Sequence, residues 1–290
     1  MLMDWGLSIR EICCNVRKCY ELYIYKNNRE RGNMAIKYNL TPIEAVKLFG
    51  YTEPEAKEEL ELFEKENHIK LPKLLFNFLS LVRNKELLST ADIWVDSDSL
   101  PYFSYQYIEE GIEDCKGDYD DPEFREQNAF YPYFKIPKEQ WPEFVDNYLQ
   151  VGSDYAAGVV FYGIKEKELT QENPPVYMLH EADPLEDWKL IAPTLSEYLM
   201  CILLDALAGV EYRTAQEVLN ENGWEFYEEE YKDEKEVKEQ LAKKKIDLSA
   251  MKKNISFYGV DSFYRYCFDE EEKIFYMVID NTSIIYIKAE

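Results

Sequence analysis

The sequence predicts an α+β protein in which helices flank a central, mostly antiparallel sheet. Apolar residues recur at helical spacing in residues 55–82 and 194–204, while runs with strand-like patterns lie between and after these two segments. This order of elements favours an α+β fold over a doubly wound one. The chain has 290 residues, 46% hydrophobic and 15% aromatic, which is enough to build a large core.

Three parts are expected along the chain. Residues 34–210 would form the main domain, and residues 211–290 a C-terminal helix plus β-meander that either extends its sheet or forms a small second domain. Residues 1–33 carry six Lys or Arg against four acids, and residues 29–33 can be encoded by a purine-rich stretch that resembles a bacterial ribosome-binding site. We therefore hypothesise that translation starts at Met34 and that residues 1–33 are a non-native extension. The alternative is a loosely amphipathic N-terminal helix.

A helical hairpin is predicted first. Thr52 and Glu55 fit a capping box at its start. Three apolar residues then share one helical face: Ala56, Leu60 and Phe63. Asn67 and His68 break this pattern, and Pro72 suits the first turn of a second helix. The apolar stripe of that second helix comprises Leu74, Leu75, Phe78, Leu79 and Val82. The two stripes should pack together and leave the Glu-rich face in solvent.

Strands and one helix are predicted in the middle of the chain. The strands are residues 90–95, 102–108, 130–136, 158–164 and 176–180, the last two as a pair. In the second strand three aromatic residues would lie on one face: Phe103, Tyr105 and Tyr107. Pro137 begins a helix whose apolar stripe comprises Trp141, Phe144, Val145, Tyr148 and Leu149.

A second long helix should follow these strands. Thr194 and Glu197 fit a capping box, and the helix is predicted to run to Leu204. The apolar run at residues 198–210 contains Asp205 and is too short to span a bilayer. We therefore expect this helix to be buried within the protein.

The last eighty residues differ in character from the rest. Thr214 and Glu217 fit the cap of a short helix that ends at Leu219. Residues 227–245 should form a solvated helix, because oppositely charged residues recur four apart. These pairs are Glu228/Lys232, Glu234/Lys238 and Glu239/Lys243. Three closing strands are predicted as a meander: residues 262–268, 274–279 and 283–288.

Two of these segments together resemble the SUKH superfamily. Its members open with a Glu-rich helix, a turn, a Leu-Pro step and a helix with an aromatic residue followed by Leu. The matching residues here are 55–66, 67–70, Leu71 with Pro72, and 76–79. A strand, an acidic turn, a Trp and an amphipathic helix match later, at 176–180, 181–187, Trp188 and 195–204. The family often has Gly before the Leu-Pro step, where this chain has Asn67 and His68, residue types that can adopt a left-handed turn conformation.

The resemblance implies a binding function with no shared catalytic residues. Many bacterial members resemble immunity proteins, which are encoded beside a polymorphic or contact-dependent toxin and neutralise it by tight association. Others act as interaction scaffolds, including the yeast cell-wall regulator in the family's name. We therefore expect a cytoplasmic immunity protein that binds a cognate toxin. The alternative is an intracellular adaptor or regulatory module of the same fold with no toxin partner.

The charge of the chain restricts its partners. Its 57 acids and 33 bases give a net charge of −24, which repels nucleic-acid backbones and attracts a basic protein surface. An acidic face can raise association rates by roughly 10 to 1000 fold at low salt, which suits an inhibitor that must capture a toxin quickly. If that toxin is a nuclease, acids could occupy its phosphate-binding cleft. The alternative interpretation is that the charge only maintains solubility.

The segment 109–126 is the candidate partner-binding site. It holds nine acids against Lys116 and Arg125, and two glycines and Pro122 predict a loop. Its candidate residues combine charge that steers a basic partner with aromatic rings that anchor it: Glu109, Glu110, Glu113, Asp114, Asp118, Tyr119, Asp120, Asp121 and Phe124. A solvated, mobile insertion is the alternative. The EF-hand pattern for calcium fails because Pro122 takes the third ligand position.

No catalytic, cofactor or metal site is predicted. The two histidines, His68 and His180, lack the spacing of a zinc motif, and the nucleophile-elbow and phosphate-loop patterns are missing from the sequence. With 57 acids, no particular carboxylate pair points to a glycosidase, so a hydrolase is the least favoured class. The six cysteines show no Cys-x-x-Cys spacing, and no signal-peptide pattern opens the chain. Both features favour a cytoplasmic protein without a membrane partner.

Overall fold

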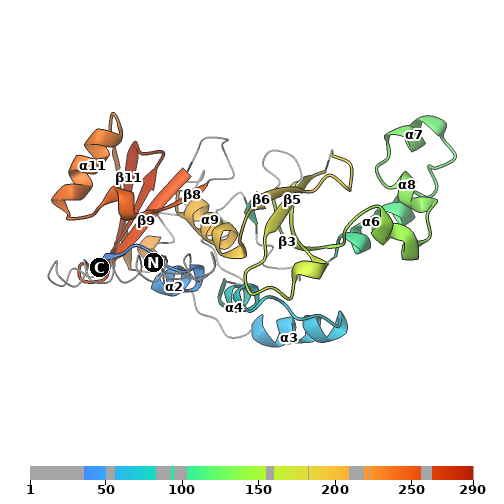
Figure 1. The fold of residues 1–290 in the computed structure, drawn as a ribbon, viewed down its shortest axis with the longest axis horizontal. Helices are drawn as coiled ribbons and strands as arrows, with labels where there is room; N and C mark the ends of the chain where they lie inside the picture. Colours follow the sequence, from blue (N-terminus) through green and yellow to red (C-terminus); the bar gives the residue numbers. More distant parts are fainter. Residues whose placement is uncertain are drawn as a thin grey trace, which may run out of the picture.

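The computed structural model describes residues 36–49, 56–82, 93–94, 103–154, 160–181, 183–208, 219–221, 223–255 and 263–289. Within these residues the fold is built on two antiparallel sheets, which confirms the predicted α+β class and antiparallel pairing. The expectation of one central sheet is wrong, because the C-terminal strands form a sheet of their own with β1. Figure 1 shows the two sheets side by side, with helix α9 (Leu195–Ala208) between them. The proposed start at Met34 and the caps at Thr52 and Thr214 lie outside the described residues.

The first sheet has five strands in chain order. They are β2 (Ile93–Trp94), β3 (Tyr148–Asp154), β4 (Val160–Lys165), β5 (Val176–His180) and β6 (Lys189–Ala192). The predicted pairing of the strands near 158–164 and 176–180 is confirmed, since Val160 lies opposite His180 in an antiparallel ladder. A short 3-10 helix, η2 (Glu166–Glu168), follows β4 in the connection to β5.

The second sheet combines the C-terminal meander with a strand from much earlier in the chain. Its strands are β1 (Ile36–Lys37), β7 (Trp224–Glu230), β8 (Lys252–Ile255), β9 (Phe263–Asp269), β10 (Ile274–Ile279) and β11 (Ser283–Ala289), ordered β1-β9-β10-β11-β7 with β8 also on β9. The predicted meander is confirmed as β9-β10-β11. Asp280 and Asn281 turn the last hairpin with φ of 49° and 59°, a left-handed conformation that these two residue types tolerate.

Residues 36–49 pack on this second sheet. Helix α2 (Pro42–Leu48) begins with a capping box in which Thr41 and Glu44 bond each other's backbone amides. The ring of Phe49, fully buried just after the helix, lies 5.2 Å from that of Trp224 and 5.5 Å from that of Phe275. Buried residues of the expected main domain and of its extension therefore belong to one continuous core, from Leu40 to Ile287.

Helix α9 is buried as expected. From Tyr198 to Leu207 every side chain is buried, because the helix packs on α2, on β6 of one sheet and on β8 of the other. A helix that is apolar all round needs such an enclosed position. Its start matches the predicted cap, since the Glu197 amide donates to Thr194 Oγ1 at 3.2 Å. Its one buried acid, Asp205, accepts hydrogen bonds from the Tyr264 hydroxyl and the Cys201 thiol.

The predicted helical hairpin is confirmed by α3 (Ala56–Glu66) and α4 (Lys73–Val82), which pack on each other. Leu60 and Phe63 of α3 are buried, as are Leu75, Phe78 and Leu79 of α4. The turn between them is stabilised by the buried Glu64 carboxylate, which accepts the Leu71 amide at 2.9 Å and pairs with Lys70. His68 supplies the left-handed residue with φ 55°.

The predicted strand at 102–108 is wrong, because these residues begin helix α6 (Ser104–Cys115). The alternation of Phe103, Tyr105 and Tyr107 indicated a strand, yet the three rings contact different neighbours. Phe103 precedes the helix and bridges to β3, while Tyr105 packs on Trp141 and Tyr107 on Phe130 and Phe161. The Gln106 side chain accepts a hydrogen bond from the Phe103 amide at 2.8 Å and so caps the start of this helix.

Two further predictions between residues 130 and 149 need correction. Residues 130–136 are not extended, because helix α8 (Tyr131–Phe134) forms there and places Tyr131 and Phe134 on one side. The helix expected from Pro137 is a short 3-10 helix, η1 (Lys138–Glu143). The residues expected to form its apolar stripe do not share one helix face, because Tyr148 and Leu149 belong to β3. Phe144 is exposed and not part of a buried stripe.

The charged C-terminal helix is shorter than predicted. Residues 227–230 complete β7, so Glu228 lies on a strand and not on a helix. Helix α11 (Glu234–Lys243) follows, with an Asp233 side-chain cap and the predicted Glu234–Lys238 pair at 2.5 Å. Lys235, and not Lys243, approaches Glu239. A 3-10 turn, η3 (Leu248–Ala250), leads into β8.

Candidate protein-binding site

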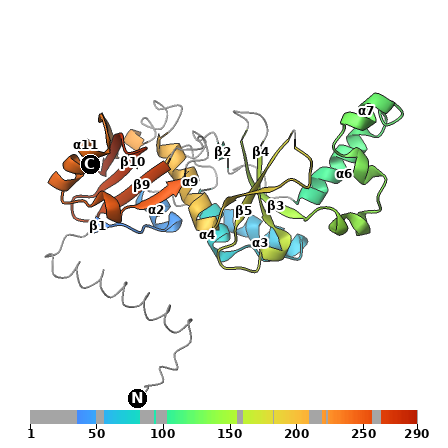
Figure 2. The ribbon, with the colours of Figure 1, turned by 45° about the horizontal axis from the view of Figure 1, so that its top comes forward.

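All nine candidate binding residues lie on one projection, residues 103–147, which we call the arm. It contains α6, helix α7 (Pro122–Gln127), α8 and η1, and it is inserted between β2 and β3 of the five-stranded sheet. Figures 1 and 2 both show α6, α7 and α8 extending away from the sheet at the end of the molecule opposite the meander. The arm therefore presents its outer surface to solvent on several sides.

The predicted acidic loop is wrong as to conformation, because most of residues 109–126 are helical. Residues 109–115 continue α6, and Pro122 occupies the first turn of α7 with the Asp121 carboxylate as its cap, bound to the Glu123 amide at 2.9 Å. Position 111 of α6 requires glycine because the Phe130 ring lies directly over it: a Cβ at this position would lie 2.5 Å from the ring. The acidic residues therefore lie on a surface formed by two helices and not on an irregular loop.

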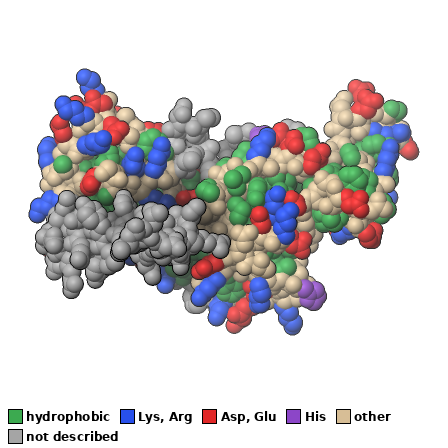
Figure 3. Space-filling model, in the orientation of Figure 1, with side chains coloured by type: hydrophobic (Ala, Val, Ile, Leu, Met, Phe, Trp, Pro, Cys, Tyr) green, Lys and Arg blue, Asp and Glu red, His purple; other side chains and the backbone are tan. Residues whose placement is uncertain are grey.

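The acidic side chains of this surface face solvent. Glu109, Glu113 and Asp121 have partners, respectively Lys138 at 2.6 Å, Lys116 at 3.2 Å and the α7 amide. Six exposed carboxylates make no ion pair with any described residue: Glu110, Asp114, Asp118, Asp120, Glu123 and Glu126. Figure 3 shows acidic side chains at the tip of the arm. These six carboxylates are available to a basic partner.

The aromatic residues are arranged differently from the sequence expectation. Tyr119 is 5% exposed, so it cannot serve as an exposed anchor. Its ring is covered by Phe124, Tyr131 and Phe134, with centroids 5.9, 5.2 and 4.8 Å away. Arg125 stabilises the turn around Tyr119, because its Nε donates a hydrogen bond to the Tyr119 carbonyl at 2.5 Å. Tyr119 is therefore the small core of the arm tip.

Two exposed rings on the arm were missed by sequence reasoning. Phe134 is 41% exposed beside Tyr119, and Phe144 is 54% exposed after η1. Lys135 lies 4.3 Å from the centre of the Tyr131 ring and lowers the pKa of its hydroxyl. The Tyr-Pro-Tyr-Phe run at 131–134 could have indicated a helical turn with Pro in its first turn, which places the first and last rings together.

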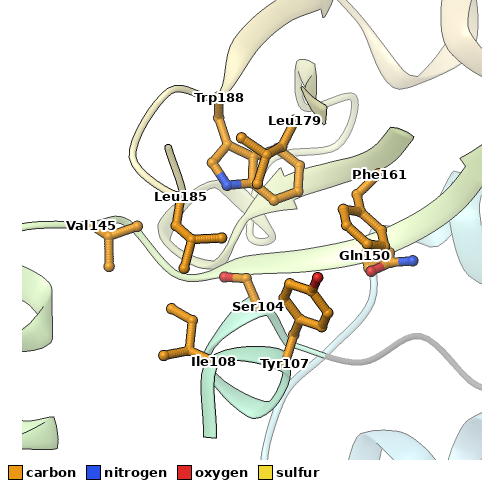
Figure 4. Close-up of a pocket in the computed structure, with 9 residues that line it drawn as sticks. All are labelled: Ser104, Tyr107, Ile108, Val145, Gln150, Phe161, Leu179, Leu185 and Trp188. Carbon is orange, nitrogen blue, oxygen red and sulfur yellow. The ribbon is translucent and has the colours of Figure 1, made fainter. Parts of the chain in front are cut away.

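The root of the arm is packed firmly on the five-stranded sheet. Figure 4 shows side chains of α6 facing Phe161, Leu179 and Trp188. The cavity that these residues line has a volume of about 10 Å³, which holds at most one water molecule and no larger ligand. Trp188 stacks on Tyr148 at 4.1 Å with an interplanar angle of 11°. The Ser104 hydroxyl accepts the Tyr148 amide at 2.9 Å, so strand and helix are joined by polar bonds as well.

Ion pairs add a second attachment where the arm returns to the sheet. Asp146 contacts Lys165 at 2.9 Å and Lys167 at 2.6 Å, both in or just after β4. The hydrogen bond from Lys167, followed by that from Lys165, holds the pKa of Asp146 below its ordinary value despite partial burial. The arm is thus fixed at both of its ends.

A wide groove of about 1100 Å³ lies elsewhere, between the hairpin turn and the connection after β4. Its lining mixes acids such as Glu61 and Glu172 with Lys65, Lys70 and Lys73. No sign of charge dominates there, so the groove specifies no class of ligand. Among the described residues no three His, Cys, Asp or Glu side chains are grouped to hold a metal ion.

Comparison with known proteins assigns no function to this chain. The sequence matches no family model, and no curated protein and no solved structure matches it. The SUKH resemblance therefore stays a prediction. No helix in the described part of the chain has the length and apolar character needed to cross a membrane.

Proposed function

We propose that this chain is a non-catalytic immunity protein that neutralises a cognate bacterial toxin by docking the arm on a basic surface of it. The observation that carries the proposal is the arm itself: a firmly rooted helical projection with unpaired carboxylates and exposed aromatic rings. Exposed rings supply buried contact area in a complex, and the carboxylates supply attraction before contact.

The electrostatics of the arm favour a basic protein over a nucleic acid. Residues 109–126 hold nine acids and two bases, within a chain of net charge −24. Phosphate backbones are repelled by such a surface, whereas Lys and Arg side chains of a partner are attracted. A projecting arm also allows the carboxylates to enter a concave site on the partner.

The choice of a toxin as partner rests on the SUKH resemblance of the hairpin and of the Trp188 segment. The same fold and surface would equally serve an adaptor that binds a basic cellular protein, which is the alternative. A toxin gene beside the gene for this chain favours the immunity function, and a gene standing alone favours the adaptor.

Co-expression with the neighbouring toxin gene tests the proposal. We expect cells to survive only when this chain is present, and the two proteins to co-purify. Cell death together with failure to co-purify would reject toxin neutralisation.

Charge reversal tests the role of the arm in the same complex. Asp118→Lys with Asp120→Lys should slow association by about tenfold at low salt and reduce its salt dependence. Glu270→Lys with Glu271→Lys is the matched control, because it changes the net charge equally in the exposed turn between β9 and β10. Equal rates for the two double variants would remove the arm tip from the interface.

A further inference from the structure

A third hollow lies where the arm passes the connection between β5 and β6. It has a volume of about 370 Å³, and we call it the arm groove. One wall comes from the arm, including Pro132, Ile136 and Phe144, and the other from residues 183–186. We propose that the arm groove receives an arginine side chain from an extended segment of the protein partner. This inference rests on the proposed function, because it assigns the arm a specific contact with that partner.

The apolar part of the groove fits the flat face and the methylene stem of an arginine. Phe144 is 54% exposed and borders the groove, although a phenyl ring ordinarily gains free energy from burial. Ile136 and Leu185 add aliphatic surface on opposite walls. A guanidinium can stack on an aromatic ring while its stem covers aliphatic side chains.

The charged part of the groove is wholly acidic. Its lining includes Glu126 from the arm, and Asp183 and Glu186 from the opposite wall, and no Lys or Arg. Asp183 is already paired with Lys189 at 2.8 Å. Glu126 and Glu186 are therefore the two carboxylates left to bind a cation, one from each wall.

Glu186 is held in position by a buried tyrosine. The Tyr133 hydroxyl donates to Glu186 Oε2 at 3.0 Å, so the second oxygen, Oε1, stays able to accept a bond from a ligand. Burial of Tyr133, together with the Glu186 carboxylate, raises the pKa of this hydroxyl, which remains a donor at neutral pH. The carboxylate is thus oriented before a partner arrives, which lowers the entropic cost of binding.

Arginine suits this site better than lysine for geometric reasons. The planar guanidinium offers five donors in a fixed fork, so one group can bond carboxylates on two walls and still stack on Phe144. The lysine ammonium is a compact, strongly hydrated charge without a face to stack. A phosphate or carboxylate ligand is disfavoured by the acids of the lining.

Binding of short peptides to the full chain tests the proposal. The probe is a blocked heptapeptide, Gly-Ser-Leu-Arg-Leu-Ser-Gly, compared with versions that carry Lys or citrulline in the central position, by isothermal titration. We expect the Arg peptide to bind about fivefold more tightly than the Lys peptide, and the neutral citrulline peptide not to bind measurably. Equal binding of the Arg and Lys peptides, or of the citrulline peptide, would overturn the proposal.

Two variants locate the bound peptide. Glu126→Gln with Glu186→Gln should weaken the Arg peptide by about tenfold or more, while Gln at 186 can still accept the Tyr133 hydroxyl. Phe144→Leu should weaken the Arg peptide about threefold and leave the Lys peptide nearly unchanged. Asp118→Asn with Asp120→Asn is the matched control for charge, with less than a twofold effect expected. An equal loss in the control would overturn the groove as the site.

The groove and the proposed function can fail separately. If reversing Asp118 and Asp120 slows toxin association but the Glu126 and Glu186 variant binds the Arg peptide as the unaltered chain does, the groove assignment alone is overturned. If the Arg peptide binds in the groove but no toxin associates with the chain, toxin neutralisation is overturned and the arginine site stands. Circular dichroism melts confirm that each variant is folded.

Discussion

The α3–α4 hairpin and the arm are both helical and acid-rich, yet they use their apolar residues in opposite ways. In the hairpin most large apolar side chains face inward: Phe63, Leu75 and Phe78 are buried in the main core, and Leu62 is the exception at 50% exposed. In the arm Tyr119 forms a small local core, while Phe134 and Phe144 remain exposed. Acidity alone therefore does not distinguish scaffold from binding surface. The position of the apolar side chains does: it assigns the hairpin to the core of the fold and makes the arm the proposed contact surface for a partner.

The largest expected effect separates the two regions by stability. Phe78→Ala should lower the free energy of unfolding by about 3–5 kcal/mol, because a fully buried ring is removed and a cavity remains. Phe134→Ala on the arm should cost about 1 kcal/mol or less, since that ring is 41% exposed. Urea unfolding measures both. A cost at Phe134 as large as that at Phe78 would show that the arm is structural.

An intermediate effect is expected at the hairpin turn. Glu64→Ala leaves the Leu71 amide without its acceptor in a buried position and should cost about 1–3 kcal/mol. Glu61→Ala, an exposed acid on the same helix, is the control and should change stability by about 0.5 kcal/mol or less. Similar values for the two variants would indicate that Glu64 is solvated like its neighbours.

At the root of the arm, Gly163→Ala should destabilise the protein by about 1–3 kcal/mol. The new Cβ would lie 2.9 Å from the Trp188 ring and 3.1 Å from Tyr148 Cβ, which forces the stacked pair apart. Near-ultraviolet circular dichroism should report the disturbed tryptophan. Gly117→Ala is the control, because nothing lies within 4 Å of its Cβ. Unchanged stability and spectrum at Gly163 would mean that the stack adjusts without cost.

The smallest effect is the pH dependence of the ion pairs at Asp146. Because its folded-state pKa lies below the ordinary value of 3.8, the stabilisation is present above that pH and is lost as the pH falls through the folded-state pKa. Asp146→Asn should therefore cost less than about 1 kcal/mol at neutral pH, since the pair is partly exposed, and nothing in strong acid. Thermal melts of both proteins from neutral pH to strong acid check the direction of this pH dependence. A cost that grows on acidification would contradict it.

Sequence reasoning succeeded where the local signal and the tertiary environment agree. The hairpin stripes, the cap at Thr194 and the meander are confirmed, and His68 does adopt the left-handed turn conformation that its type allows. It failed in the arm, where alternating aromatic residues imitate a strand although each ring packs on a different neighbour. Exposure of the acids could be anticipated from their number, but burial of Tyr119 depends on α8, whose conformation was predicted wrongly.

The pairing of the earliest described strand with the meander has a consequence for how the chain folds. The Tyr266 hydroxyl donates to the Leu40 carbonyl across 226 positions of sequence, and Ile36 lies opposite Asp269 in the ladder. The five-stranded sheet joins successive segments, so it can assemble while the ribosome is still synthesising the rest. Closure of a very long loop is slow, and partly formed sheets expose strand edges to aggregation. We therefore expect the six-stranded sheet to form after the five-stranded sheet, once β9, β10 and β11 have been synthesised.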